Sequence, residues 1–167
     1  MNPHSTSIRR WLVALCALGS LLALYAVTGR AQTPSAKLED LSAFAQTTLT
    51  ISSGGASHAF TIWVANTQAR EEQGLMFVRE LPADRGMVFV GDAPKVWTMW
   101  MRNTYIPLDM LFVAVDGQVV KIAHALPHDE TTISSDVPVN AVIELQAGIC
   151  DKLHIKVGDF AKWRPAP

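Results

Sequence analysis

Apolar residues recur at every second position over several short stretches of the chain, which is the period of a half-buried β-strand. Residues 47–52 and 57–65 alternate in this way around a Ser-Gly-Gly turn at 53–55, so they predict a hairpin. Asp116-Gly117 is a strong signal for a second hairpin. The further strands are expected at 87–90, 95–101, 108–115, 118–124 and 141–146, with a last one ending at Trp163.

Only one stretch carries the signals of a helix start and a helix end. Asn66 or Thr67 can cap a short helix at 68–73, and Gly74 can end it. Because hairpins dominate and no long helical pattern occurs, we expect a mainly β fold. The predicted architecture is a compact, mostly antiparallel, partly closed barrel with one short helix.

The N-terminal stretch has the pattern of an export signal. Arg9 and Arg10 precede an apolar run at 11–27, and small residues stand at Gly29 and Ala31. We expect cleavage after Ala31 and a periplasmic or otherwise exported protein; the alternative is an uncleaved N-terminal anchor, the only membrane contact expected. The expected organisation is a signal peptide at 1–31, a tether at 32–46 and a single domain at 47–165.

Composition narrows the function without naming it. The chain has 167 residues, a formal net charge of −1 and 17% charged residues. Such a balance argues against a nucleic-acid partner, which usually meets a basic face. No glycine-rich phosphate loop is present, which weighs against a nucleotide-driven enzyme. Removal of the signal segment would leave Cys150 as a lone cysteine, so no internal disulfide is expected.

Four blocks of sequence together resemble a known family. They are residues 70–79, 86–90, 100–112, and 144–148 followed by Gly158-Asp159. Their order and spacing are similar to those of the domain-of-unknown-function 192 family. The resemblance implies a small β-rich fold and frequent export, and it implies no established activity. Met99 and Arg102 depart from the family pattern, which commonly has an aromatic residue and a lysine at these positions.

The block from Trp100 to Asp109 is the first candidate site. Strand alternation puts Trp97, Met99 and Met101 on one face, and Thr98, Trp100 and Arg102 on the other. One interpretation is a structural clamp of buried aromatic residues with an Arg102–Asp109 ion pair. The other is a binding cleft with an aromatic floor and a cationic wall, suited to a sugar or a carboxylated small molecule.

A pair of carboxylates is the second candidate site. Two carboxylates facing one cleft, among a polar set of Arg70, Arg79, Asp109, Glu144 and Asp159, could perform acid–base chemistry. Such a carboxylate pair indicates, as one alternative function, a small envelope hydrolase that uses Asp109 or Glu144.

A soft-metal site is the other alternative. Met99 and Met101, with Trp97 nearby, could offer thioethers to copper(I). His124, His128 and Asp129 lie close together in sequence, but Pro127 disfavours the helix that would aim both imidazoles one way. No full ligand set occurs at tight spacing, so no metal site and no cofactor is expected.

We therefore expect a monomeric, non-catalytic protein that binds a ligand or plays an accessory role in the cell envelope. Its partner would be an unknown small molecule or envelope protein, and no catalytic residue is assigned. A long polar loop at 126–138 is of a length that often covers a binding site. The expected binding residues are Trp100, Arg102, Asn103, Asp109, Arg70 and Glu144.

Overall fold

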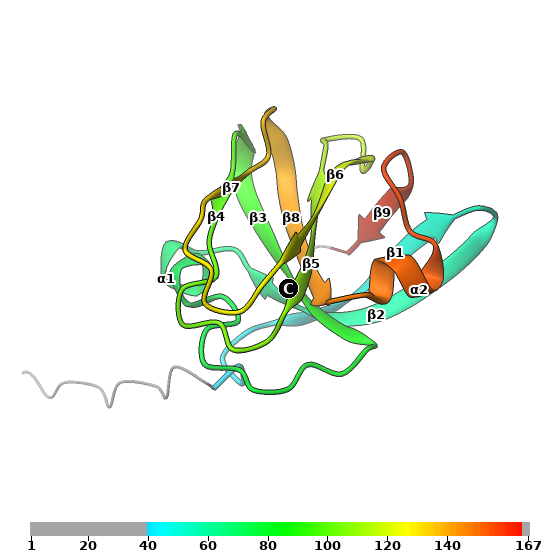
Figure 1. The fold of residues 1–167 in the computed structure, drawn as a ribbon. Helices are drawn as coiled ribbons and strands as arrows, with labels where there is room; N and C mark the ends of the chain where they lie inside the picture. Colours follow the sequence, from blue (N-terminus) through cyan, green and yellow to red (C-terminus); the bar gives the residue numbers. More distant parts are fainter. Residues whose placement is uncertain (1–39, 165–167) are drawn as a thin grey trace, which may run out of the picture. The chain divides into compact units, whose positions relative to one another are not determined.

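A computed structural model describes residues 40–164 of the chain. These residues form a seven-stranded sheet in the order β6-β5-β8-β3-β2-β1-β9 and a separate two-stranded pair, β4-β7 (Figure 1). The elements in chain order are β1 Gln46–Ser53, β2 Ala56–Ala65, α1 Gln68–Gln73, β3 Arg85–Lys95, β4 Thr98–Met99, β5 Leu108–Val113, β6 Val119–Ala125, β7 Ile133–Ser134, β8 Val139–Gln146, α2 Ile149–Leu153 and β9 Phe160–Trp163.

The expected mainly β, partly closed barrel is confirmed. Among the strand pairings in residues 40–164, only β2–β3 is parallel. The helix at 68–73 is confirmed as α1, with Thr67 as its N-cap and Gly74 at its end. The expected signal peptide at 1–31 and most of the tether at 32–46 lie outside the described residues. In the described part of the chain, no helix has the length and apolar character needed to span a membrane.

Two local predictions were wrong. A second short helix, α2, follows Gly148, whereas one short helix was predicted for the whole fold. Within the stretch 95–101, Lys95 ends β3, and the only further strand is Thr98–Met99, whose partner is not the main sheet but the small strand β7. The pairing of β3 with β8 shifts in register between Val90 and Lys95, and the apolar stretch after Lys95 then crosses over the sheet as a strap. We call residues 95–104 the strap.

The curled sheet closes on itself where its two edge strands meet. Gln118, just before β6, forms a bridge with Phe160 of β9. The amide of Val119 donates to the carbonyl of Asp159 at 2.8 Å, and Gly158 donates to Val119 at the same distance. The sheet thus encloses an inner core, which holds buried residues such as Leu111 and Ile143.

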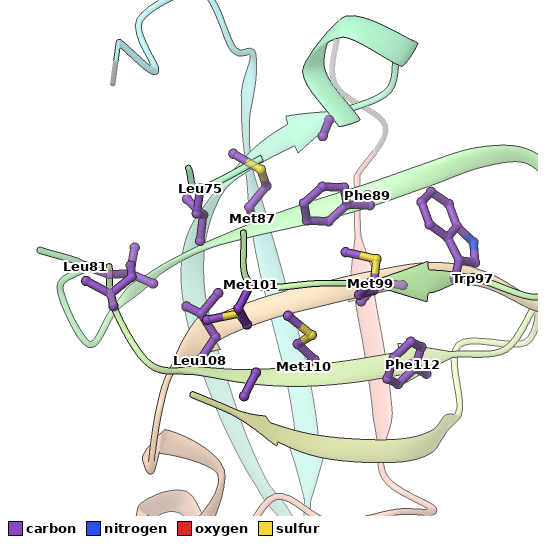
Figure 2. Packing of buried hydrophobic residues seen from close by; sticks show 14 of the residues in the cluster. Leu75, Leu81, Met87, Phe89, Trp97, Met99, Met101, Leu108, Met110 and Phe112 are labelled. Carbon is purple, nitrogen blue, oxygen red and sulfur yellow. The ribbon is translucent and has the colours of Figure 1, made fainter. Parts of the chain in front are cut away.

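The outer face of the sheet carries a second core that is rich in methionine. Alternation along β5 sends Leu108, Met110 and Phe112 to this face, where they pack under the strap and neighbouring loops. Figure 2 shows the side chains of Met87, Met99, Met101 and Met110 gathered between the strap and the strands. Unbranched methionine fills irregular space well, so this core can adapt its packing to what lies beside it.

Candidate functional site

A cavity of about 400 Å³ opens beside the methionine-rich core. Its size falls within the range of small-molecule sites, roughly 300–1,000 Å³. One wall is α1 with the turn that follows it, and the opposite wall is the strap. The lining residues are Gln68, residues 71–76, Phe89, residues 95–100, Thr104 and Glu144.

Glu144 is the most unusual residue of this lining. Its position on β8 lies directly opposite Met87 of β3 and Met110 of β5, so it projects from the outer face between two apolar side chains. Only 4% of the residue is exposed, and within residues 40–164 its Oε2 atom has no hydrogen-bond partner. Burial raises the pKa of this carboxyl from 4.5 to about 8, which leaves Glu144 mostly neutral at pH 7.

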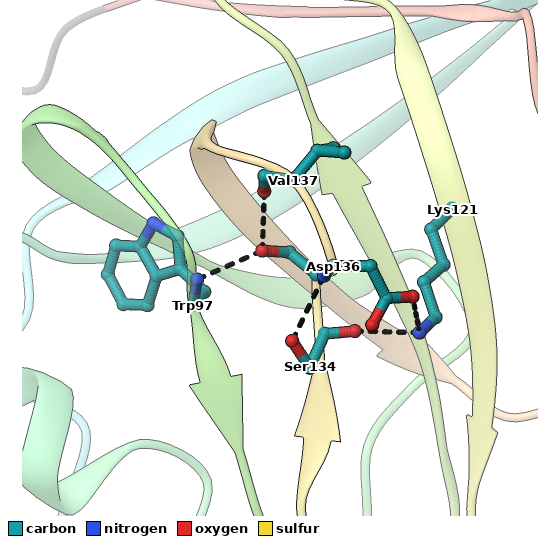
Figure 3. A network of polar contacts seen from close by, with 6 residues as sticks. Trp97, Lys121, Ser134, Asp136 and Val137 are labelled. Atoms are coloured by element: carbon teal, nitrogen blue, oxygen red, sulfur yellow. Dashed lines mark hydrogen bonds and ion pairs between the residues drawn. The ribbon is translucent and has the colours of Figure 1, made fainter.

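The strap is held over the cavity by the loop at 126–138. The hydroxyl of Ser135 accepts from the amide of Trp97 at 3.0 Å and donates to the carbonyl of Val137 at 2.7 Å. Lys121 of β6 donates to the Ser134 carbonyl and to the Asp136 carboxylate, each at 2.7 Å (Figure 3). The strap is thereby tied to a loop that is itself tied to the main sheet.

Charged side chains stand at the rim of the cavity. The Nζ atom of Lys95 lies 3.7 Å from a carboxylate oxygen of Glu71 and 3.9 Å from the centre of the Trp97 ring. Glu72 also lines the cavity, and its Oε1 accepts from the side-chain amide of Gln68 at 2.9 Å. The rim therefore presents the carboxylates of Glu71 and Glu72 and the indole ring of Trp97. Lys95 already contacts the Glu71 carboxylate and this ring.

The structure separates the residues of the expected Trp100–Asp109 site. The two faces expected for residues 97–102 are confirmed, since Trp97, Met99 and Met101 are buried whereas Trp100 is 46% exposed. Trp100 lines the cavity. The Arg102–Asp109 ion pair is not formed, because the Nε atom of Arg102 lies 3.7 Å from Glu130 instead.

Asn103 shapes a turn at the edge of the cavity. It adopts a left-handed backbone with φ of 55°, a conformation that asparagine tolerates better than most residues. Its carbonyl accepts from the amide of Phe77 at 2.8 Å, and its side-chain amide approaches the sulfur of Met76 at 3.9 Å. Asn103 thus holds the turn after α1, a wall of the cavity, without lining the cavity itself.

Asp109 is fully buried on the other face of the sheet. Its Oδ1 lies 2.7 Å from Nδ1 of His124, and its Oδ2 accepts from the amide of Cys150 at 2.9 Å, at the start of α2. Asp109 is paired with Leu145 of the inner core, one position from Glu144, so the two carboxylates face opposite sides of the sheet. They do not form the pair that a two-carboxylate hydrolase requires.

The remaining members of the polar set have contacts within the fold. Arg70 donates to Asn66 at 3.0 Å and to the carbonyl of Ala43 at 2.9 Å, which anchors the segment before β1 to α1. Arg79 lies over the ring of Tyr105 at 4.7 Å. Asp159 accepts from the amide of Lys156 at 2.7 Å. None of the three lines the cavity above Glu144.

The groups considered for metal binding are dispersed. Met99 lines the cavity, while Met101 is fully buried in the core. His124 is held by Asp109, and His128 packs against Tyr105 with 4.8 Å between ring centres. Within residues 40–164, no group of three or more His, Cys, Asp or Glu is arranged to hold a metal ion. Burial, with the nearby Asp109 carboxylate, raises the pKa of the Cys150 thiol, which keeps it protonated.

Comparison with known proteins identifies the family but not an activity. A family model, DUF192, described as "Uncharacterized ACR", matches residues 49–163. The chain belongs to the DUF192 family. The resemblance seen in the four sequence blocks is thus confirmed, and a search of curated proteins found no relative.

Two solved structures are similar to this DUF192 chain. One is a protein of unknown function from Novosphingobium aromaticivorans DSM 12444, 38% identical, with a TM-score of 0.72, covering 80% of this chain and 94% of its own. The other, from Sinorhizobium meliloti 1021, is provisionally described as a transcription regulator. It is 38% identical, with a TM-score of 0.71, and covers 72% of this chain and 95% of its own.

Of the six binding residues expected from the sequence, two, Trp100 and Glu144, line the cavity of this DUF192 domain. It missed the wall formed by α1 and the following turn, including Glu71, Glu72 and Met76. A signal was present, because the block at 70–79 spans this wall. From this block only Arg70 was expected to bind a ligand, and Arg70 does not line the cavity.

Proposed function

We propose that this chain is a non-catalytic binding protein that takes a small molecule into the cavity above Glu144. A single observation carries the proposal: a buried carboxyl, whose Oε2 has no partner among the described residues, lies at a cavity of about 400 Å³. An unpaired buried polar group destabilises a fold, so such groups occur most often where a ligand or a reaction uses them. The ligand would combine an apolar body with one polar group aimed at Glu144.

The character of the lining supports a binding role. Phe89, Trp97 and Trp100 supply aromatic surface, and Met76 and Met99 supply flexible, polarisable side chains. Ligand sites of this type are mainly apolar, with a few polar groups that fix orientation. The expected partner carboxylate, Asp109, lies on the opposite face of the sheet and Cys150 is buried in the inner core, so the proposal is for binding rather than hydrolysis.

Native mass spectrometry tests this function directly. The wild-type protein, isolated gently from its own host, should carry a small non-covalent adduct. Glu144→Leu, which removes the polar group but keeps an apolar side chain of similar size, should lose it. Glu130→Gln is the matched control, because it removes an exposed carboxylate outside the cavity. An adduct-free wild-type protein, or the same adduct in all three proteins, would contradict the proposal.

We also propose that the protein works outside the cytoplasm, in the cell envelope. Support comes from the basic, apolar and small-residue pattern of residues 1–31. N-terminal sequencing of the protein from its host should read from Gln32. A protein that retains Met1 and fractionates with the membrane would indicate the uncleaved anchor instead. A full-length chain in the cytoplasmic fraction would overturn the proposal.

A further inference from the structure

We infer that the ligand of this cavity is a small organic cation, an ammonium group on a compact apolar body that pairs with Glu144. The inference rests on the proposed binding function and names the class of ligand. It starts from the charges of the lining. Of the four ionisable side chains there, three carry carboxyl groups, namely Glu71, Glu72 and Glu144, and one is a lysine, Lys95. Once Glu144 is ionised, this set carries a net negative charge, so an anionic ligand would meet repulsion and a cation would be attracted.

The protein already holds one ammonium group at this lining. Nζ of Lys95 sits 3.9 Å from the centre of the Trp97 ring and 3.7 Å from a Glu71 oxygen. A carboxylate together with an indole face is the combination that recognises ammonium ions through ion pairing and cation–π attraction. The rim thus shows, within the chain itself, the chemistry that we assign to the ligand.

Glu144 lacks the cation that Glu71 possesses. Its carboxyl faces Met87 and Met110 from the neighbouring strands, and these side chains offer no charge and no hydrogen-bond donor of any strength. The aromatic residues Phe89 and Trp100 lie on the same cavity lining. A ligand cation would therefore supply the positive charge that Glu144 does not receive from the described part of the chain. It would lie beside these two aromatic side chains.

Pairing with a cation would also change the protonation of Glu144. Burial raises the pKa of the free carboxyl to about 8, so the carboxyl is ionised in only about one molecule in ten at pH 7. Binding must then release a proton, and affinity should rise roughly tenfold per pH unit below pH 8 and level off about a unit above it. The other charged groups that face the cavity are Glu71 and Glu72 from the α1 wall and Lys95 from the end of β3.

Choline and 3,3-dimethylbutan-1-ol are suitable probes because they share one shape and differ only in a quaternary nitrogen replaced by carbon. Choline does not titrate at its ammonium group, so any pH dependence belongs to the protein. Affinities are measured by NMR titration, followed at the Trp97 and Trp100 indoles and the Gly74 amide. We expect choline to bind at least tenfold more tightly than the alcohol at pH 8.5, and the preference to shrink at pH 6.

Variants assign the preference to one carboxylate. Glu144→Gln should abolish both the preference for choline and its pH dependence, while Glu130→Gln should leave both intact. A preference that survives Glu144→Gln and disappears in Glu72→Gln would place the cation at the rim and overturn the role of Glu144. If Glu144→Gln does not fold, the comparison of the two probes on the wild-type protein still decides whether the charge is recognised.

The outcomes separate this inference from the binding function beneath it. Equal binding of both probes, or tighter binding of the alcohol, would overturn the cation and leave the cavity as a ligand site. Failure of both probes, with the Glu144-dependent adduct still seen by native mass spectrometry, would likewise overturn the cation alone. Failure of both probes with no adduct would overturn the inference and the proposed function together.

Discussion

At the scale of single residues, Glu144 and Asp109 show how one position along a sheet decides the chemistry of a carboxyl. Asp109 has two hydrogen-bond partners, one of them the amide of Cys150, and is used by the fold. Glu144 is paired with Met87 and Met110 and has no partner on Oε2 among the described residues. Of these two carboxyl groups, Glu144 is the one with unsatisfied polarity that a ligand can complete.

The burial of Glu144 predicts an unusual dependence of stability on pH. Because its folded-state pKa of about 8 lies above its ordinary value of 4.5, the unfolded chain loses this proton first as pH rises. The free energy of unfolding of the wild type, relative to Glu144→Gln, should be highest below pH 4.5. It should then fall by up to about 1.4 kcal/mol per pH unit until about pH 8.

Urea denaturation of both proteins at a series of pH values measures this difference. Glu130→Gln serves as the control, because its carboxylate is exposed and paired only at the surface with Arg102. A wild-type to Glu144→Gln difference that does not change between pH 4.5 and pH 8 would show that the carboxyl is not desolvated.

At the scale of elements, the strap is an apolar stretch that has the alternation of a strand but crosses the main sheet instead of joining it. Its alternation is real, since Trp97 and Met99 are buried and Trp100 is exposed. Its buried face packs on the methionine-rich core rather than within a sheet layer. Beyond the end of β3, its one strand, Thr98–Met99, pairs with Ile133–Ser134. The strap is therefore a wall whose position depends on a few hydrogen bonds from the 126–138 loop.

Ser135 is the residue whose loss should loosen the strap. Ser135→Ala removes the hydroxyl that bridges Trp97 and Val137, which leaves the buried amide of Trp97 without its acceptor. We expect the free energy of unfolding to fall by about 1–3 kcal/mol. The cavity should also lose affinity for its ligand. Ser57→Ala, at an exposed position of β2, should change stability by less than about 0.5 kcal/mol.

Denaturation curves of the two serine variants provide the measurement. Equal stability of Ser135→Ala and Ser57→Ala would mean that the Ser135 hydroxyl does not stabilise the strap.

At the scale of the whole domain, the local pattern predicted most of the elements but not the site. The hairpins, α1 and the two faces of the strap follow from alternation, turn residues and caps, which act over a few residues. The closure between Gln118 and Phe160, and the separation of Asp109 from Glu144, depend on strand order and register between distant segments. No short-range pattern encodes them, so an Arg102–Asp109 pair looked plausible from sequence and is absent.

The same dependence on topology explains why the sequence predicted only some of the residues that line the cavity. Trp100 and Glu144 stood out because each is a residue of unusual chemistry within a β-rich stretch. The α1 wall brings Glu71 and Glu72 to the cavity through the fold, across more than seventy residues from Glu144. Sequence indicated which residues are unusual, and only the topology showed which of them meet.

Titration of the Glu144 side chain itself tests the proposed ligand site most directly. Carbon-13 NMR of the glutamate carboxyls, with Glu144→Gln to assign the signal, reports the pKa of this group in the free wild-type protein. We expect a pKa near 8, because Glu144 is buried and its Oε2 has no partner among the described residues. A pKa near the ordinary 4.5 would show a solvated or paired carboxylate and would contradict the binding site proposed here.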